Sequence, residues 1–124
     1  MDIALWVAQG LLALAFAGAG FAHAFRFDQF SANHRTAWAA DVGRPGMRVI
    51  GLLEIAGAIG VVLPALTGIL PWLTQVAAVG LALVMLAAAT FHARRGEFSG
   101  IVPNAVLGAI ALFVVWGRFV EAPF

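Results

Sequence analysis

Residues 3–25 read IALWVAQGLLALAFAGAGFAHAF, a run in which only Gln9 and His23 are polar. A helix needs about 20 apolar residues to cross the roughly 30 Å hydrocarbon core of a bilayer, so this run predicts a membrane span. Open strands would leave unpaired backbone groups in lipid, and none of the apolar runs alternates as a barrel strand would. The sequence therefore predicts an all-α integral membrane protein, a four-helix transmembrane bundle in a single domain over residues 1–124. Three further runs of the same character provide the other spans: residues 49–66, 72–91 and 101–120.

The composition of the chain excludes most other classes of protein. Of its 124 residues, 63% are hydrophobic and 10% are charged, whereas about a quarter of the residues in soluble domains are charged. The chain is also far too apolar for intrinsic disorder. A net charge of +1 provides no basic patch, so we expect no nucleic-acid partner. The absence of cysteine excludes disulfides, thiolate metal sites and thiol redox chemistry by this chain.

The arginines are distributed unevenly between the two sides of the membrane. Four spans place the segments 26–48 and 92–100 on one side and both termini on the other. Arginine-rich segments usually stay in the cytoplasm, so we predict a multi-pass protein of a bacterial-type inner (plasma) membrane with both termini on the extracytoplasmic side. An alternative, a signal peptide cleaved near Ala24, is disfavoured by the length of the first run and the lack of a basic residue before it. Six of the seven arginines lie in the two segments: Arg26, Arg35, Arg44, Arg48, Arg94 and Arg95.

The segment between the first two spans contains a periodic set of aromatic residues. Phe27, Phe30, His34 and Trp38 recur at intervals of three or four residues. This spacing favours a short helix that lies in the inner interface with its apolar face toward lipid. The alternative is an irregular loop that contains several aromatic residues.

Glu54 is the one charged residue deep within an apolar run. It lies about 9 Å along a helix from the cytoplasmic edge of its span. A carboxylate at that depth is costly unless it is paired or protonated, so Glu54 is predicted to face the interior of the bundle. Two interpretations stay open: a proton-carrying or ligand-binding carboxylate, or a buried hydrogen-bond partner that fixes helix packing.

The topology brings other polar residues to the depth of Glu54. His23 lies near the inner end of the first span, His92 follows the third, and Asn104 opens the fourth. Arg48 opens the second span, but it lies on a different face of that helix from Glu54. We therefore expect a histidine of another helix to pair with Glu54, and a carboxylate–imidazole pair can pass protons. No His-Glu-x-x-His motif is present, so no metal site is predicted, and the catalytic residues stay unknown.

Small residues predict where the helices approach one another closely. The second span contains a smooth face of glycines, and the first span offers a similar stripe. In the outer half of the bundle, Gln9 and Gln75 are the main polar side chains, and we expect each to bridge helices by hydrogen bonding. Four glycines carry the packing prediction: Gly18, Gly51, Gly57 and Gly60.

The second span resembles the DoxX-like family of small four-helix membrane proteins. The resemblance lies in the run GLLEIAGAIGVVLP at residues 51–64, preceded by Arg48. It extends to the turn HARRGE at residues 92–97 and to Pro103-Asn104. Relatives include subunits linked to quinone-coupled sulfur oxidation, membrane partners of redox proteins, and proteins that assist receptor assembly. The resemblance implies a compact bundle in which three positions are the most expected to matter: Arg48, Glu54 and Asn104.

Three functions are consistent with these features. The first is an accessory or binding subunit that holds a quinone-like or lipid-like ligand, or a membrane protein partner, at the cluster around Glu54. The sequence contains no complete set of catalytic residues that would argue for an enzyme. No cofactor is predicted beyond such a quinone or lipid. The second is a membrane subunit of a quinone-linked oxidoreductase that relays protons through Glu54 and a histidine, with electrons supplied by a cofactor or partner. The third is a small proton-coupled transporter, which would need a homo-oligomer because four short spans enclose little volume.

Overall fold

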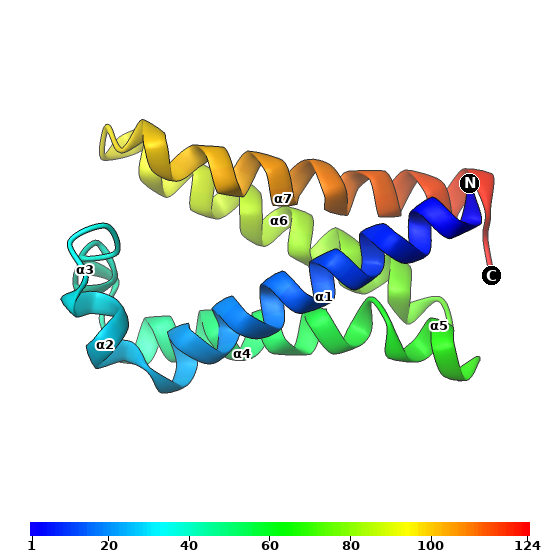
Figure 1. The fold of residues 1–124 in the computed structure, drawn as a ribbon, viewed down its shortest axis with the longest axis horizontal. Helices are drawn as coiled ribbons and strands as arrows, with labels where there is room; N and C mark the ends of the chain where they lie inside the picture. Colours follow the sequence, from blue (N-terminus) through cyan, green and yellow to red (C-terminus); the bar gives the residue numbers. More distant parts are fainter.

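The computed structural model describes all 124 residues, which fold into helices and the turns between them, with no strand (Figure 1). Four stretches are long and apolar enough to cross a membrane: Asp2–Phe25, Arg44–Thr67, Leu73–Arg94 and Phe98–Glu121. The predicted all-α architecture with four spans is thereby confirmed. In chain order the elements are α1 (Asp2–Phe25), α2 (Phe27–Ala32), α3 (Ala39–Val42), α4 (Arg44–Gly60), α5 (Leu63–Thr67), α6 (Leu73–Arg94), α7 (Phe98–Trp116) and the π-helical turn η1 (Gly117–Glu121).

The long helices form two pairs, α1 with α4 and α6 with α7 (Figure 1). The pairs meet toward the end that holds both termini and α5, which we call the terminal end. They diverge toward the opposite end, which holds α2, α3 and the turn between α6 and α7, and which we call the arginine-rich end. The buried core draws on all four long helices and includes Leu12, Phe16, Ala58, Leu81 and Val114.

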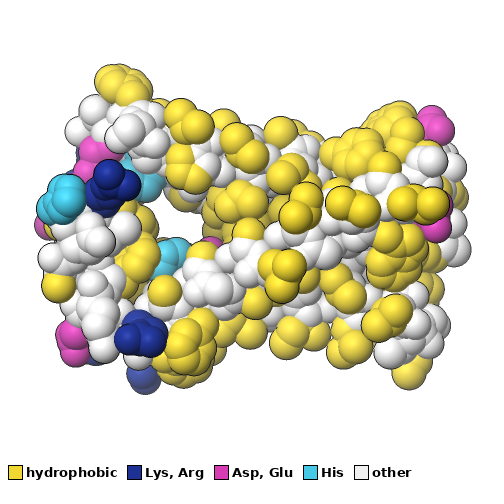
Figure 2. Space-filling model, in the orientation of Figure 1, with side chains coloured by type: hydrophobic (Ala, Val, Ile, Leu, Met, Phe, Trp, Pro, Cys, Tyr) yellow, Lys and Arg dark blue, Asp and Glu magenta, His cyan; other side chains and the backbone are white.

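The outer surface of the bundle is apolar between two charged ends. Large hydrophobic side chains are exposed on every long helix, for example Leu14, Leu53, Leu86 and Val106. Figure 2 shows these hydrophobic side chains over the middle of the molecule and the charged ones at its two ends. Contiguous apolar surface on this scale would aggregate in water, whereas lipid solvates it.

Glycines set the closest approaches between helices. A Cβ at Gly51 would lie 2.5 Å from the Gly20 carbonyl oxygen of α1, and one at Gly57 would collide with the side chain of Leu81 in α6. Gly60 similarly leaves room for Ala77. The prediction for Gly18 is wrong: a Cβ there would meet nothing within 4 Å. Gly18 faces outward, and the α1 glycine at the α4 contact is Gly20.

The second span differs from its predicted bounds at both ends. Its helix begins at Arg44 because Pro45 occupies the first turn, where a missing N–H is harmless. α4 then ends at Gly60 and a separate helix, α5, begins at Leu63 with Pro64 in its first turn. Proline cannot donate to the carbonyl four residues earlier, and its ring clashes with that carbonyl, so a continuous helix over 49–66 is not formed.

Both glutamines bridge helices, as predicted. Gln9 Nε2 of α1 donates to the carbonyl oxygen of Val61, just beyond α4, at 2.6 Å. Gln75 Nε2 of α6 donates to the carbonyl oxygen of Arg118 in η1 at 3.0 Å. Each bond ties together two segments that are far apart in the chain and satisfies a carbonyl near a helix end.

Candidate functional site

A histidine and a carboxylate on two neighbouring helices form the centre of the site. His23, in the last turn of α1, lies with Nδ1 2.5 Å from Oε1 of Glu54 in α4. The Glu54 residue is 2% exposed, and the His23 side chain is 13% exposed. Gly20 and Gly51, which flank the pair by three residues on each helix, let the two backbones come close enough for this contact. Glu54 thus faces the neighbouring helix and pairs with one of the two histidines that the sequence offered.

The pair lies where the two helix pairs diverge. The space-filling view shows an opening at the arginine-rich end, with a histidine and an acidic side chain at its edge (Figure 2). On α1 and α4, the histidine–carboxylate pair is His23–Glu54. Because His23 is in the last turn of α1, the buried pair lies at the end where the bundle opens.

Aromatic rings surround the histidine and close the site toward the arginine-rich end. Trp38 lies at their centre, with ring centroids 5.7 Å from Phe30, 5.8 Å from Phe91, 4.9 Å from His92 and 6.3 Å from His23. All four contacts are edge-to-face, the arrangement that aromatic rings favour. Trp38 thereby connects α1 and α6, which belong to different helix pairs.

The segment that carries these rings differs from the predicted interfacial helix. It forms two short helices, α2 and α3, and the rings of Phe30 and Trp38 pack on other protein rings rather than toward lipid. Phe27 instead lies under the guanidinium of Arg44 at 4.9 Å. A salt bridge of 2.6 Å from Arg95 to Asp41 fastens α3 to the end of α6. The segment α2–α3 thus lies across the arginine-rich end of the bundle and leaves the side of the bundle open (Figure 2).

The other predicted site residues form no hydrogen bond or ion pair with Glu54. His92 is buried, but its Nδ1 lies 3.3 Å from Oε1 of Glu97, and its ring rests against Gly100. Asn104 Nδ2 donates to the carbonyl oxygen of Gly100 at 3.0 Å. No group of three His, Cys, Asp or Glu side chains converges anywhere in the chain.

Arg48 also makes no contact with Glu54. It is exposed, and its Nε donates to the carbonyl oxygen of Ala24 at 3.4 Å. This agrees with the expectation that the two residues lie on different faces of α4. Of the five polar residues singled out from the sequence, only His23 and Glu54 are joined directly, and His92 shares the ring cluster around Trp38.

The pair can do two things chemically. The hydrogen bond between His23 Nδ1 and Glu54 Oε1 can form with the proton on either atom, so a pair of this kind can give or take a proton in a low-dielectric environment. The edges and faces of Phe30 and Trp38 beside it can stack on a flat apolar ring. A planar molecule with a polar edge would use both properties.

A second polar network, at the terminal end, was not predicted from the sequence. Arg118 is 1% exposed, its Nε donates to Gln9 Oε1 at 2.8 Å, and its Nη1 donates to Asp2 Oδ1 at 2.5 Å. The guanidinium lies over the rings of Phe124 at 4.3 Å and Trp6 at 5.3 Å. The sequence signal for this network was the one arginine on the side opposite the other six. Because the network ties the first and last helices together, it closes the terminal end.

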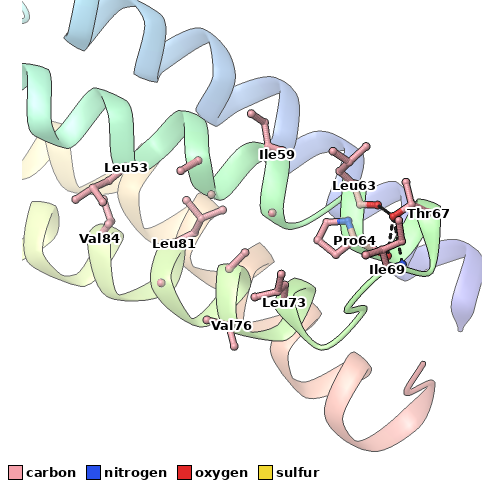
Figure 3. Close-up of a pocket in the computed structure, with 15 residues that line it drawn as sticks. Leu53, Ile59, Leu63, Pro64, Thr67, Ile69, Leu73, Val76, Leu81 and Val84 are labelled. Atoms are coloured by element: carbon pink, nitrogen blue, oxygen red, sulfur yellow. Dashed lines mark hydrogen bonds between the residues drawn. The ribbon is translucent and has the colours of Figure 1, made fainter.

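A long apolar groove runs between α4, α5 and α6 (Figure 3). Its volume is about 750 Å³, and it extends from Leu53 and Val84 to Thr67 and Ile69 near the terminal end. Thr67 is its one polar lining residue, and that hydroxyl already donates to the carbonyl oxygen of Leu63 at 2.8 Å. Leu53 and Glu54 are consecutive in α4 and point about 100° apart, so the groove is separate from the His23–Glu54 pair.

Comparison with known proteins agrees with this architecture. The profile of the DoxX-like family matches residues 7–114, which is most of the chain. No significant match was found among curated proteins or among solved structures. The matched region contains the His23–Glu54 pair, the ring cluster and most of all four spans. The chain is an integral membrane protein that belongs to the DoxX-like family.

Proposed function

We propose that this chain is an accessory or binding subunit that holds the head of a quinone-like molecule at the His23–Glu54 pair. The observation that supports the proposal is a buried histidine–carboxylate pair 2.5 Å apart, at the end where the bundle opens and next to aromatic rings that meet edge-to-face. We propose further that the arginine-rich end faces the cytoplasm of a bacterial-type inner membrane, since six of the seven arginines belong to it.

The residues of the site match the parts of such a molecule. A quinone carbonyl accepts a hydrogen bond, and a protonated His23 whose Nδ1–H is bound to Glu54 would donate one from Nε2. The flat ring would stack on the face of Phe30 or Trp38 and meet the other ring edge-on, because these two rings are nearly perpendicular with centroids 5.7 Å apart. The hydrophobic tail would leave through the gap between the helix pairs into the bilayer. When bound, a quinone supplies two-electron redox chemistry that these side chains lack.

The short His23–Glu54 contact also favours a second function. In a membrane subunit of a quinone-linked oxidoreductase, the pair would carry protons between the bound head and the arginine-rich end. His92 and Glu97, 3.3 Å apart at that end, would continue the path. Electrons would have to come from a partner protein or an added cofactor, because the chain has no cysteine with which to exchange them.

Quenching of tryptophan fluorescence tests the proposed site directly. Replacing Trp6, Trp72 and Trp116 by phenylalanine leaves Trp38, which contacts the His23 ring, as the only tryptophan reporter. Titration of this variant in nanodiscs with a short-chain ubiquinone should give saturable quenching. Glu54→Gln should weaken the affinity by about 10- to 100-fold, because a hydrogen bond to a charged group contributes about 1.5–3 kcal/mol.

Glu121→Gln is the matched control, since it makes the same chemical change at an exposed carboxylate at the terminal end. It should leave the quenching curve unchanged. Equal curves for Glu54→Gln and the parent would contradict a ligand site at the pair. Extraction of the gently purified wild-type protein provides an independent check: recovery of a bound phospholipid in place of a quinone would overturn the proposed ligand class.

A further inference from the structure

One face of α6 carries a shallow groove that is apolar along most of its length and basic at one end. Its volume is about 590 Å³, and it lies away from the His23–Glu54 pair. The lining residues recur every three or four positions, so they share one side of the helix. They run from two exposed leucines in mid-span to two arginines at the arginine-rich end: Leu83, Leu86, Ala87, Thr90, Phe91, Arg94 and Arg95.

The two arginines of the groove differ in whether acidic side chains form salt bridges with them. Arg95 makes salt bridges of 2.8 Å to Glu97 and 2.6 Å to Asp41. The hydrogen bond to Glu97, and then that to Asp41, raise the pKa of Arg95 above its ordinary value. Arg94 is exposed and forms no salt bridge with any acidic side chain of the chain. The guanidinium of Arg94 therefore lies at the basic end of the apolar groove without an acidic partner.

The length of the groove fits one leaflet of a bilayer. Leu83 and Arg94 are separated by about 16 Å along the helix axis. The hydrocarbon of one leaflet is about 15 Å thick. With Arg94 at the level of the headgroups, an acyl chain lying along the groove would therefore end near Leu83, which is 59% exposed.

We propose that this face of α6 binds an anionic phospholipid, with its phosphate on Arg94 and one acyl chain along Leu86 and Leu83. Guanidinium and phosphate have matching charge and geometry, and arginine is the residue that most often makes such bidentate contacts. The unmatched positive charge at one end and the exposed leucines below it distinguish this groove from the one beside α4, whose only polar lining group is a hydroxyl. A second copy of the chain would cover the leucines, but its acidic side chains at this end, Asp28, Asp41 and Glu97, are already in salt bridges with its own arginines.

Native mass spectrometry of the full chain in detergent tests this proposal. Titration with phosphatidylglycerol and phosphatidylcholine of identical acyl chains should show preferential retention of phosphatidylglycerol. Arg94→Gln should reduce that preference about five-fold, the effect of one cation near an anionic headgroup. Arg35→Gln is the matched control, because Arg35 is also exposed, lies at the same end and forms no salt bridge. It should keep the wild-type preference.

Three results would overturn the proposal. Equal losses for Arg94→Gln and Arg35→Gln would assign the preference to diffuse surface charge. Displacement of phosphatidylglycerol by excess inorganic phosphate would indicate an anion site whose affinity does not depend on an acyl chain. Ala87→Trp should fill the groove and weaken binding of both lipids. If this variant instead abolishes a dimer and leaves lipid binding intact, the occupant is a second copy of the chain.

Discussion

Replacing Gly51 by alanine should force α1 and α4 apart. A Cβ at this position would lie 2.5 Å from both the backbone nitrogen of Ala24 and the carbonyl oxygen of Gly20. These atoms belong to the α1 backbone, so no rotation of a side chain can relieve the contact. To reach an ordinary separation of 3.4 Å, the two helices must move apart by about 0.9 Å.

The displacement should have two measurable consequences. Overpacking of this kind lowers the free energy of unfolding by about 1–3 kcal/mol. The same movement would lengthen the distance from His23 Nδ1 to Glu54 Oε1 from 2.5 Å to about 3.4 Å. That exceeds the upper limit of about 3.2 Å for an N–H···O hydrogen bond. The variant should therefore lose stability and the hydrogen bond of the site together.

Unfolding by sodium dodecyl sulfate, followed by circular dichroism, measures the first effect, and histidine ¹⁵N NMR measures the second. Gly18→Ala is the control on the same helix pair, since a Cβ there meets nothing within 4 Å. It should leave the unfolding midpoint and the His23 resonance unchanged. If Gly51→Ala behaves in the same way as Gly18→Ala, the inferred backbone contact between α1 and α4 is wrong.

Two further substitutions test the ends of the bundle. Trp38→Ala removes the ring that connects the helix pairs. It should lower the free energy of unfolding by about 1–3 kcal/mol, because the ring is only partly buried. Amide hydrogen exchange in α2 and α3 should accelerate. Unchanged exchange would show that Trp38 does not hold this segment. Arg118→Gln should lower the free energy of unfolding by about 1–3 kcal/mol, because the buried oxygen of Gln9 loses its donor. The Asp2 side chain is 61% exposed and stays solvated, so a larger loss in the detergent titration would contradict this reasoning.

The spans could be predicted from the sequence, whereas the exact helix faces could not. Apolar runs of about 20 residues have one stable backbone conformation in lipid, the helix, so the spans follow directly from the sequence. Which glycine meets a neighbour depends on rotation about the helix axis. Gly18 and Gly20 are two residues apart and point about 160° apart around α1. Both fit the pattern of small residues, and only the packing against α4 selects Gly20.

The site was predicted in part for a similar reason. Depth along the helices brought His23 and His92 to the level of Glu54, but depth does not specify which imidazole faces the carboxylate. Spacing in the segment 26–43 indicated a helical aromatic face without indicating what that face packs against. In the structure, Trp38 packs on His23 of α1 and on His92 of α6, at the end where the two helix pairs diverge.

Glu54 still has two interpretations, and Glu54→Gln separates them by stability as well as by binding. If the carboxylate serves packing, the variant should lower the free energy of unfolding by about 1–3 kcal/mol, as the loss of a buried hydrogen bond does. If it serves a ligand, removing its charge should leave stability unchanged or raise it, because a buried ion pair is often no more stabilising than a neutral replacement.

We predict unchanged or higher stability for Glu54→Gln. Glu54 makes a single hydrogen bond, to His23, at the end where the helix pairs diverge. The buried Arg118, in contrast, makes three side-chain hydrogen bonds and two aromatic contacts in a closed end of the bundle. A charge retained for stability would be expected to have partners as numerous as those of Arg118. A loss of 1–3 kcal/mol in the detergent titration, together with an unchanged quinone curve, would assign Glu54 to packing, because the variant would then have lost a structural contact and no binding group.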